Sequence, residues 1–277
     1  MKRKKRIYNL LLYFLLGILA ILVLVPVYYL IVTTFKSGTE AALHPMALPT
    51  SISLGSYKEA FVKMQYPRAF LNTLIITGVS VGGIIITASM CGYALNRREK
   101  AKWSKGVFLL ILSGIMFPYQ MSILGLYRLI RDLHLMNKLT AVILVDIAVN
   151  LPFAVFLFKS FVSTIPVELE EAARIDGAGV YKTFWMITFP LLKPTIATVA
   201  ILNTLTIWND FMGPLYFLQS REKDVILQEV YRNIGQFSTD WTSLFPMMVL
   251  GVLPLLIFYL AMQKMVIGGV MSGSVKG

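Results

Sequence analysis

Residues 166–190 read PVELEEAARIDGAGVYKTFWMITFP, a charged and glycine-containing stretch between two long apolar runs. Pro166 suits the first turn of a helix, and the three glutamates that follow it complement the positive end of the helix dipole. A short helix is therefore predicted to begin here. A chain that is otherwise largely apolar concentrates charge in this one connection, which indicates a docking surface for a soluble partner.

The two glycines of this stretch divide it. Gly177 and Gly179 can adopt left-handed or other strained backbone conformations, so the first helix is predicted to end near Asp176. A second helix is predicted to begin near Val180 and to stop before Pro190. The stretch is thus interpreted as a helix-turn-helix, with an ordinary amphipathic surface loop as the alternative.

The composition places the rest of the chain in a bilayer. Of its 277 residues, 57% are hydrophobic and 14% are charged, which is more apolar and less charged than a soluble domain. Long uncharged or nearly uncharged runs can each cross about 30 Å of hydrocarbon as a helix. Six spans are predicted in a single domain over 1–277, at about 10–34, 70–95, 106–127, 139–160, 194–218 and 242–264.

Basic residues give the orientation. The apolar run after the KRKKR of residues 2–6 is too long for a secretory signal, so it is interpreted as a retained first span. With the amino terminus inside, the segments 2–6, 97–105 and 165–193 and the tail 265–277 all lie on the cytoplasmic side, where Lys and Arg are enriched. The net charge of +12 is explained by these span ends and not by nucleic-acid binding.

A set of residue types at fixed offsets points to a family. The set consists of Glu171, Ala172, Ala173, Gly177, Ile187 and Pro190. With this set, the stretch resembles the cytoplasmic signature loop of permease subunits of binding-protein-dependent ABC importers; Phe189 stands where the usual pattern has Leu. WNDFMGPL at 208–215 and GGVMSGSVKG at 268–277 are similar to segments of the sugar-importing, maltose-type branch.

The resemblance implies a fold and a function. The fold is all-α and integral to the membrane, a six-transmembrane-helix ABC importer permease with a cytoplasmic coupling helix-turn-helix at 165–193. The function is ATP-driven uptake of a sugar by alternating access, in a bacterial or archaeal cytoplasmic membrane with both termini cytoplasmic. The implied partners are a second homologous permease subunit in a heterodimer, two ATPase subunits that hold ATP and Mg, an extracytoplasmic sugar-binding protein and the carbohydrate.

The resemblance also assigns roles within the loop. Glu171 is expected to pair with a basic or amide group of the ATPase, and Ala172 and Ala173 permit close approach. Asp176 is expected to cap or orient the turn. Gly177, Ile187 and Pro190 complete the expected coupling element.

No enzyme active site is predicted. GAGVYKT at 177–183 has Tyr181 where a phosphate-binding loop requires Gly, so nucleotide chemistry belongs to other chains. His44 and His134 do not belong to any cluster with metal-ligand spacing, and Cys91 is the one cysteine. No metal and no cofactor are therefore expected in this chain.

Polar groups inside the predicted spans mark a candidate pathway. An ionised Asp at a span centre costs about 2.5–3.5 kcal/mol on insertion scales, so Asp146 and Asp210 must face the bundle interior, a polar partner or water. A structural hydrogen-bond network is the alternative to a pathway, and it is favoured for Asp146. The candidate set is Asn203, Asn209, Asp210, Asp146, Asn150, Tyr119 and Gln120. The last two follow Pro118, which is predicted to kink the third span.

Other readings stay open at this point. A proton-coupled secondary transporter would use Asp146 or Asp210 as its proton carrier, and a membrane scaffold would transport nothing. Gly78 and Gly82 form a small-xxx-small pair that is expected to let another helix approach closely. The segment 36–68 is expected to form a small extracytoplasmic cap.

Overall fold

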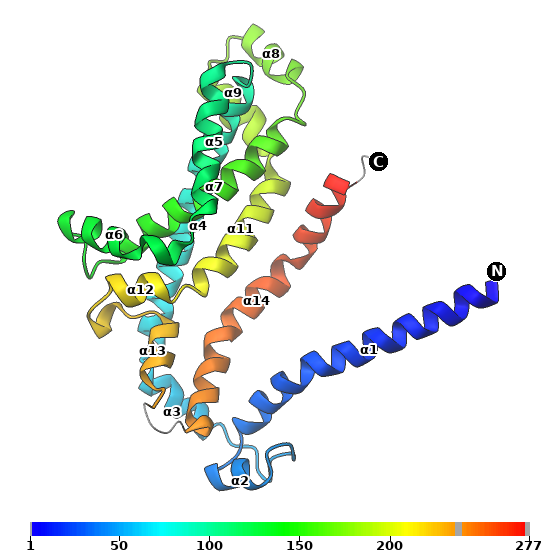
Figure 1. Ribbon diagram of the computed structural model, residues 1–277, viewed down its shortest axis with the longest axis vertical. Coiled ribbons are helices and arrows are strands. Elements are labelled where there is room, and N and C mark those ends of the chain that lie inside the picture. The colour runs from blue at the N-terminus through cyan, green and yellow to red at the C-terminus, as the bar shows by residue number, and fades with distance from the viewer. Residues whose placement is uncertain (1, 236–239, 275–277) are drawn as a thin grey trace. The chain divides into compact units, whose positions relative to one another are not determined.

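The computed structural model describes the backbone of residues 2–235 and 240–274 and the side chains of 8–235 and 240–263. Within these ranges the chain forms helices and connecting loops, with no β-strand (Figure 1). The helices belong to two compact units, one made of 1–66 with 229–253 and the other of 67–228 with 254–277.

The first unit contains α1 (Lys2–Thr33), α2 (Gly38–Leu43), α3 (Gly55–Lys63) and the first part of α14 (Trp241–Ser274). The ring of Tyr29 packs edge-on against Phe245, with centroids 5.8 Å apart. The Tyr66 hydroxyl donates a hydrogen bond of 2.9 Å to the Leu250 carbonyl. The segment after α1 folds into α2 and α3; that it forms an extracytoplasmic cap stays a prediction.

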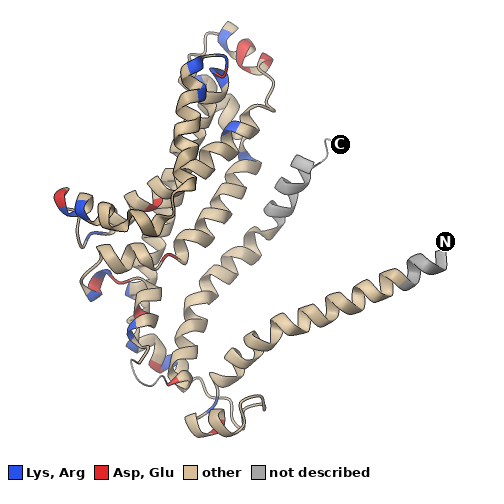
Figure 2. Ribbon diagram, in the orientation of Figure 1, with Lys and Arg blue, Asp and Glu red and all other residues tan. Residues whose placement is uncertain are grey.

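The second unit contains most of the membrane-spanning helices. Its helices are α4 (Tyr66–Arg97), α5 (Lys102–Met116), α6 (Tyr119–Asp132), α7 (Leu139–Val162), α8 (Glu168–Ile175), α9 (Val180–Thr183), α10 (Phe189–Leu191), α11 (Lys193–Trp208), α12 (Met212–Phe217) and the start of α13 (Ile226–Arg232), with a π-helix η1 (Phe184–Thr188) and a 3-10 turn η2 (Arg221–Lys223). Figure 2 shows α7 and α11 almost free of charge, while charged residues gather around α8 and around α6.

Four helices are long and apolar enough to cross a membrane, at 8–33, 66–97, 139–162 and 241–263. Two bent helix pairs raise the number to six if each pair counts as one span. The predicted spans 70–95 and 139–160 lie inside α4 and α7. These counts refer to the described ranges.

Both bent pairs differ from the straight spans expected. The third span, expected at 106–127, is broken between α5 and α6, whose axes meet at 104°. Phe117 is extended (φ −91°, ψ 119°) because a residue before proline is driven out of the helical region, and the break falls at Pro118, as predicted. The fifth, expected at 194–218, ends as a helix at Trp208, and α11 is bent by 74° from the helices before it.

The close contact between α4 and α7 depends on two glycines. A Cβ built on Gly92 would lie 2.8 Å from the backbone nitrogen of Lys159, and one built on Gly83 would lie 2.6 Å from Ile147 Cδ1. The expectation for Gly78 and Gly82 is wrong within this chain, since no atom lies within 4 Å of a Cβ at either position.

Candidate functional site

Helix α8 is the first half of the predicted coupling element, and its two central glutamates face opposite environments. Glu170 is completely buried, whereas Glu171 and Ala172 are exposed and Ala173 is half-buried. Three glutamates in the first turn match the positive end of the helix dipole, as the sequence predicts. The helix begins at Glu168, so Pro166 lies before it and not in its first turn.

The Glu170 carboxylate is held by residues of two other elements, α4 and η1. It accepts hydrogen bonds from the Tyr93 hydroxyl (2.9 Å) and from Arg97 Nε (2.8 Å), both on α4. Arg97 Nη2 lies 2.7 Å from the same carboxylate, and the Thr188 hydroxyl of η1 donates at 3.2 Å. Arg97 Nη2 also donates to the Ile165 carbonyl at 3.2 Å.

This cluster is a buried ion pair with its hydrogen bonds made. A buried carboxylate is costly unless a charge and several donors compensate it, and Arg97, 13% exposed in its side chain, supplies the charge. Arg174, on the next turn of α8, lies 3.9 Å away and is half-exposed, so its contribution is small. Glu170 therefore fastens α8 to the end of α4. The residue pattern of the loop indicates Glu171 and gives no sign that Glu170 is buried.

The turn after α8 requires Gly177. Gly177 has φ +82°, a left-handed conformation that costs other residues about 1–2 kcal/mol. The Ala178 amide donates a hydrogen bond of 2.9 Å to the Ala173 carbonyl, and this bond caps the C-terminal end of α8. Asp176 is the C-cap residue, exposed, and its backbone amide donates to the Ala172 carbonyl. Gly179 needs no special conformation, because it is extended (φ −70°, ψ 166°).

The second half of the element continues past the expected stop. The helical path runs through α9 and η1 into α10, so the prediction that it stops before Pro190 is wrong. Pro190 is tolerated because it lies in the first turn of α10, where its missing amide is not needed. Ile187 is half-buried in η1. The Phe184 ring packs against Tyr93 at 5.1 Å, so this half also rests on α4.

The outer face of the element is apolar as well as acidic. Leu169 is 46% exposed and Ile175 is 86% exposed, and both lie on α8 together with the exposed Glu171. Exposed apolar side chains rimmed by charge are typical of surfaces that another protein covers.

The candidate pathway residues fall into separate environments. Asn150, Asn203 and Asn209 each donate to a carbonyl four residues earlier in their own chain segment, at 2.8 Å. Asn203 is buried and Asn209 is exposed. Gln120 lines a different cavity, of about 500 Å³, together with Tyr127 and Tyr216.

Asp210 has a structural task at the end of α11. Its carboxylate accepts from the amides of Met212 (3.0 Å) and Gly213 (3.1 Å) and so caps α12. A Cβ on Gly213 would lie 2.5 Å from that carboxylate and 3.4 Å from the Tyr119 hydroxyl, which places the tyrosine beside the acid. Asp146 is close enough to interact electrostatically with Asp210.

Asp146 is 6% exposed, and its Oδ2 atom has no hydrogen-bond partner among the described residues. The structure thus brings Tyr119, Asp146 and Asp210 into one polar cluster. The three asparagines stay outside it, since their side chains bond to nearby backbone.

The chain is similar to several known proteins. The family model described as "Binding-protein-dependent transport system inner membrane component" matches residues 48–271. The chain is 37% identical to the melibiose/raffinose/stachyose import permease protein MelC of Bacillus subtilis (strain 168), over 91% of each chain. It is 30% identical to a probable starch degradation products transport system permease protein of Thermoanaerobacterium thermosulfurigenes, over 99% of each.

Another similar protein is the diacetylchitobiose uptake system permease protein NgcG of Streptomyces coelicolor, 30% identical over 92% of this chain and 85% of the relative. Among solved structures, a chain of a bacterial ABC transporter that imports the acidic polysaccharide alginate superposes with a TM-score of 0.84. It is 23% identical, and the match covers 95% of this chain and 97% of that one, which shows a shared fold.

Proposed function

The chain belongs to the family of binding-protein-dependent transport system inner membrane components, and from that premise we propose that it is the permease subunit of an ATP-driven oligosaccharide importer. Relatives that cover nearly its whole length are permease proteins for melibiose, raffinose and stachyose, for starch degradation products and for diacetylchitobiose. They give the proton-coupled alternative with Asp146 or Asp210 no support.

The proposal divides the work among several chains. Two ATPase subunits hold ATP and Mg, an extracytoplasmic sugar-binding protein delivers the carbohydrate, and a second homologous permease completes the pathway as a heterodimer. Both termini and α8 lie in the cytoplasm, in a bacterial or archaeal cytoplasmic membrane. The basic residues around the ends of α4 and α5 support this orientation.

The buried Glu170 cluster is the observation that supports coupling through α8. Glu171 and Ala172 face outward to meet the ATPase, while Glu170 on the same turn is bonded to Arg97 and Tyr93 of α4. A push on the outer face is therefore passed to a spanning helix through a buried ion pair. Gly177 sets the direction in which the second half leaves the turn.

The polar cluster supports a pathway role for the centre of the bundle. Tyr119 and Asp210 both lie where a helix is interrupted, α5 to α6 and α11 to α12. Broken helices in a membrane are tolerated where they are buried in protein or line an aqueous cavity. In the proposed importer, Asp146 supports this cluster from α7. The substrate passes beside these breaks.

The tail has a separate proposed role. Residues 265–277 are expected to reach the ATPase interface, and their side chains lie outside the described residues. Removing 268–277 should weaken ATPase association. Wild-type transport with a full complement of ATPase in the truncated protein would contradict this role.

Transport by the reconstituted complex tests the coupling role of Glu171. Glu171→Ala removes a charge-assisted contact and is expected to lower uptake and substrate-stimulated ATP hydrolysis about tenfold. Glu168→Ala is the matched control, because it removes the same charge from an exposed position on the same helix. Equal activity of the two variants would contradict the assignment of the outer face.

A further inference from the structure

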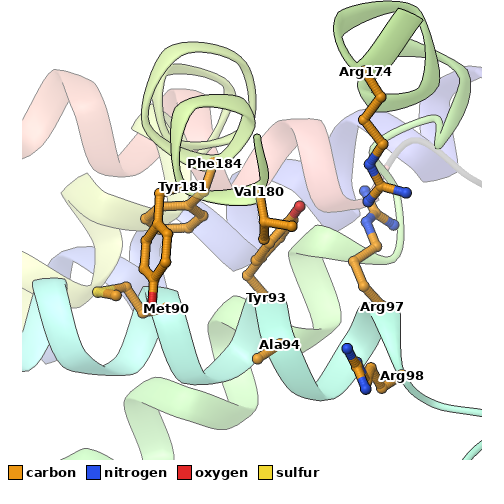
Figure 3. Close-up of a pocket in the computed structure, with 9 residues that line it drawn as sticks. All are labelled: Met90, Tyr93, Ala94, Arg97, Arg98, Arg174, Val180, Tyr181 and Phe184. Carbon is orange, nitrogen blue, oxygen red and sulfur yellow. The ribbon is translucent and has the colours of Figure 1, made fainter. Parts of the chain in front are cut away.

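A cavity of about 640 Å³ lies between the end of α4 and the two halves of the coupling element (Figure 3). It is lined by Met90, Tyr93, Ala94, Arg97, Arg98, Arg174, Val180, Tyr181 and Phe184. All nine residues belong to one compact unit. Neither the coupling role nor the polar cluster of the spans accounts for this cavity.

One end of the cavity carries excess positive charge. Arg97, Arg98 and Arg174 lie together at that end in Figure 3, and Glu170 is the carboxylate paired with two of them. The Arg98 side chain forms no hydrogen bond or ion pair with the described part of the chain, and the residue is exposed. One carboxylate against three guanidinium groups leaves a site suited to an anion with several oxygens.

The other end is apolar. Figure 3 places Met90, Tyr181 and Phe184 together, away from the arginines. Met90 is 36% exposed and Tyr181 is 74% exposed, so both offer uncovered surface to a ligand. A cavity with cationic and apolar ends fits an amphiphile better than a small inorganic ion.

The position of the cavity identifies the kind of amphiphile. The cavity lies at the last turns of α4, a helix long and apolar enough to cross a membrane, where Arg97 and Arg98 follow the apolar run. Basic pockets between spanning helices on the cytoplasmic side bind acidic lipid headgroups. We propose that this cavity binds the headgroup of an anionic phospholipid, with its phosphate on Arg98 and Arg174 and its glycerol and first methylenes against Met90 and Tyr181.

The proposal has a consequence for α8. Arg174 is on α8 and Arg98 follows α4, so one phosphate would bridge the two elements that Glu170 already joins. The inference requires only that this end of α4 lie at a membrane surface, and it holds whatever sugar is transported.

Lipid binding to the purified full chain tests the proposal. The probe is dioleoylphosphatidylglycerol, measured by native mass spectrometry from detergent and by retention in nanodiscs. Arg98→Ala and Arg174→Ala are each expected to weaken binding about tenfold, the loss of one charge-assisted contact. Arg131→Ala is the matched control, since Arg131 is an exposed arginine on α6 outside the cavity. Equal binding by the cavity variants and the control would overturn the proposal.

Two further arms identify the source of the anion. Dioleoylphosphatidylcholine and millimolar inorganic phosphate should each fail to displace the probe. Displacement by phosphate alone at the affinity of the lipid would show a free-anion site and overturn the proposal. The assembled transporter should retain the lipid; its loss on assembly, with Arg98→Ala impairing association instead, would show that a partner chain fills the cavity.

Discussion

Replacing Glu170 separates the internal ion pair of α8 from its outer face. Glu170→Ala leaves the Arg97 guanidinium, 13% exposed, without its carboxylate and removes an acceptor from Tyr93 and Thr188. Removing one partner of a buried pair costs about 3–5 kcal/mol. At about 2–4 °C per kcal/mol for a chain of this size, the melting temperature should fall by on the order of 10 °C.

Companion variants identify the cause of that loss. Glu170→Gln keeps the shape and one acceptor, so it should cost less than the alanine. Arg97→Met combined with Glu170→Ala should recover part of the stability, because no buried charge then lacks a partner. Glu171→Ala is the control, since an exposed substitution usually changes stability by no more than about 0.5 kcal/mol.

Thermal unfolding of the purified chain in detergent, followed by size-exclusion chromatography, measures these effects. Equal melting temperatures for Glu170→Ala and Glu171→Ala would refute the assignment of Glu170 as the internal anchor. No recovery in the Arg97→Met double variant would show that the loss comes from packing and not from the bare charge.

Four other perturbations test separate features. Gly177→Ala should cost about 1–2 kcal/mol and impair uptake, whereas Gly179→Ala should be nearly neutral. Thermal unfolding and uptake measure both effects, and equal effects of the two variants would contradict the left-handed conformation of Gly177. Gly92→Ala should cost about 1–3 kcal/mol because the added methyl group forces α4 away from α7. Gly78→Ala is the control, since its Cβ would meet no atom within 4 Å, and a lower folded yield is expected for the Gly92 variant alone. Asp210→Asn should reduce transport modestly and Asp210→Leu more strongly, because Leu leaves the Gly213 amide without its acceptor. Wild-type uptake and folded yield in the Asp210→Leu variant would exclude a role for the polar cluster that contains Asp210. Hydrogen bonds from Ser243 and Thr242 hold the pKa of Asp240 below its usual value of 3.8. The stability that this cap gives α14 is therefore present above pH 3.8 and is lost as the pH falls through the lowered pKa. Asp240→Ala should cost about 1 kcal/mol at neutral pH and should abolish this acid dependence in thermal unfolding.

Apolar length predicted two of the long straight helices well. Helices α4 and α7 contain the predicted segments with a few residues added at the ends, because burial of an uninterrupted apolar run depends little on its neighbours. The length of an apolar run does not show whether its helix is straight or bent. The apolar run 106–127 predicts one span, yet the chain bends by 104° at Phe117 and Pro118. Hydropathy gives no information about the angle of such a bend.

The coupling element shows a different limit. The signature pattern located α8 and the left-handed Gly177 correctly, but it could not show which glutamate is buried. The apolar pattern points the wrong way, since Leu169 and Ile175 are exposed while Glu170 is enclosed. Arg97, more than seventy residues earlier, supplies the charge that makes that burial favourable, and no local pattern links the two residues.

The π-helix η1 places one more residue in its turn than an α-helix would, within the second half of the coupling element. In η1 the Phe189 amide bonds to the Phe184 carbonyl five residues earlier, where an α-helix would reach back four. Deleting one residue from this turn leaves a continuous α-helix but rotates everything before it by about 100°. Tyr181 would then leave the cavity wall and Thr183 its buried position. In the proposed importer, losing this residue would therefore turn the loop to a different angle about the helix axis and change the face that it presents to the ATPase.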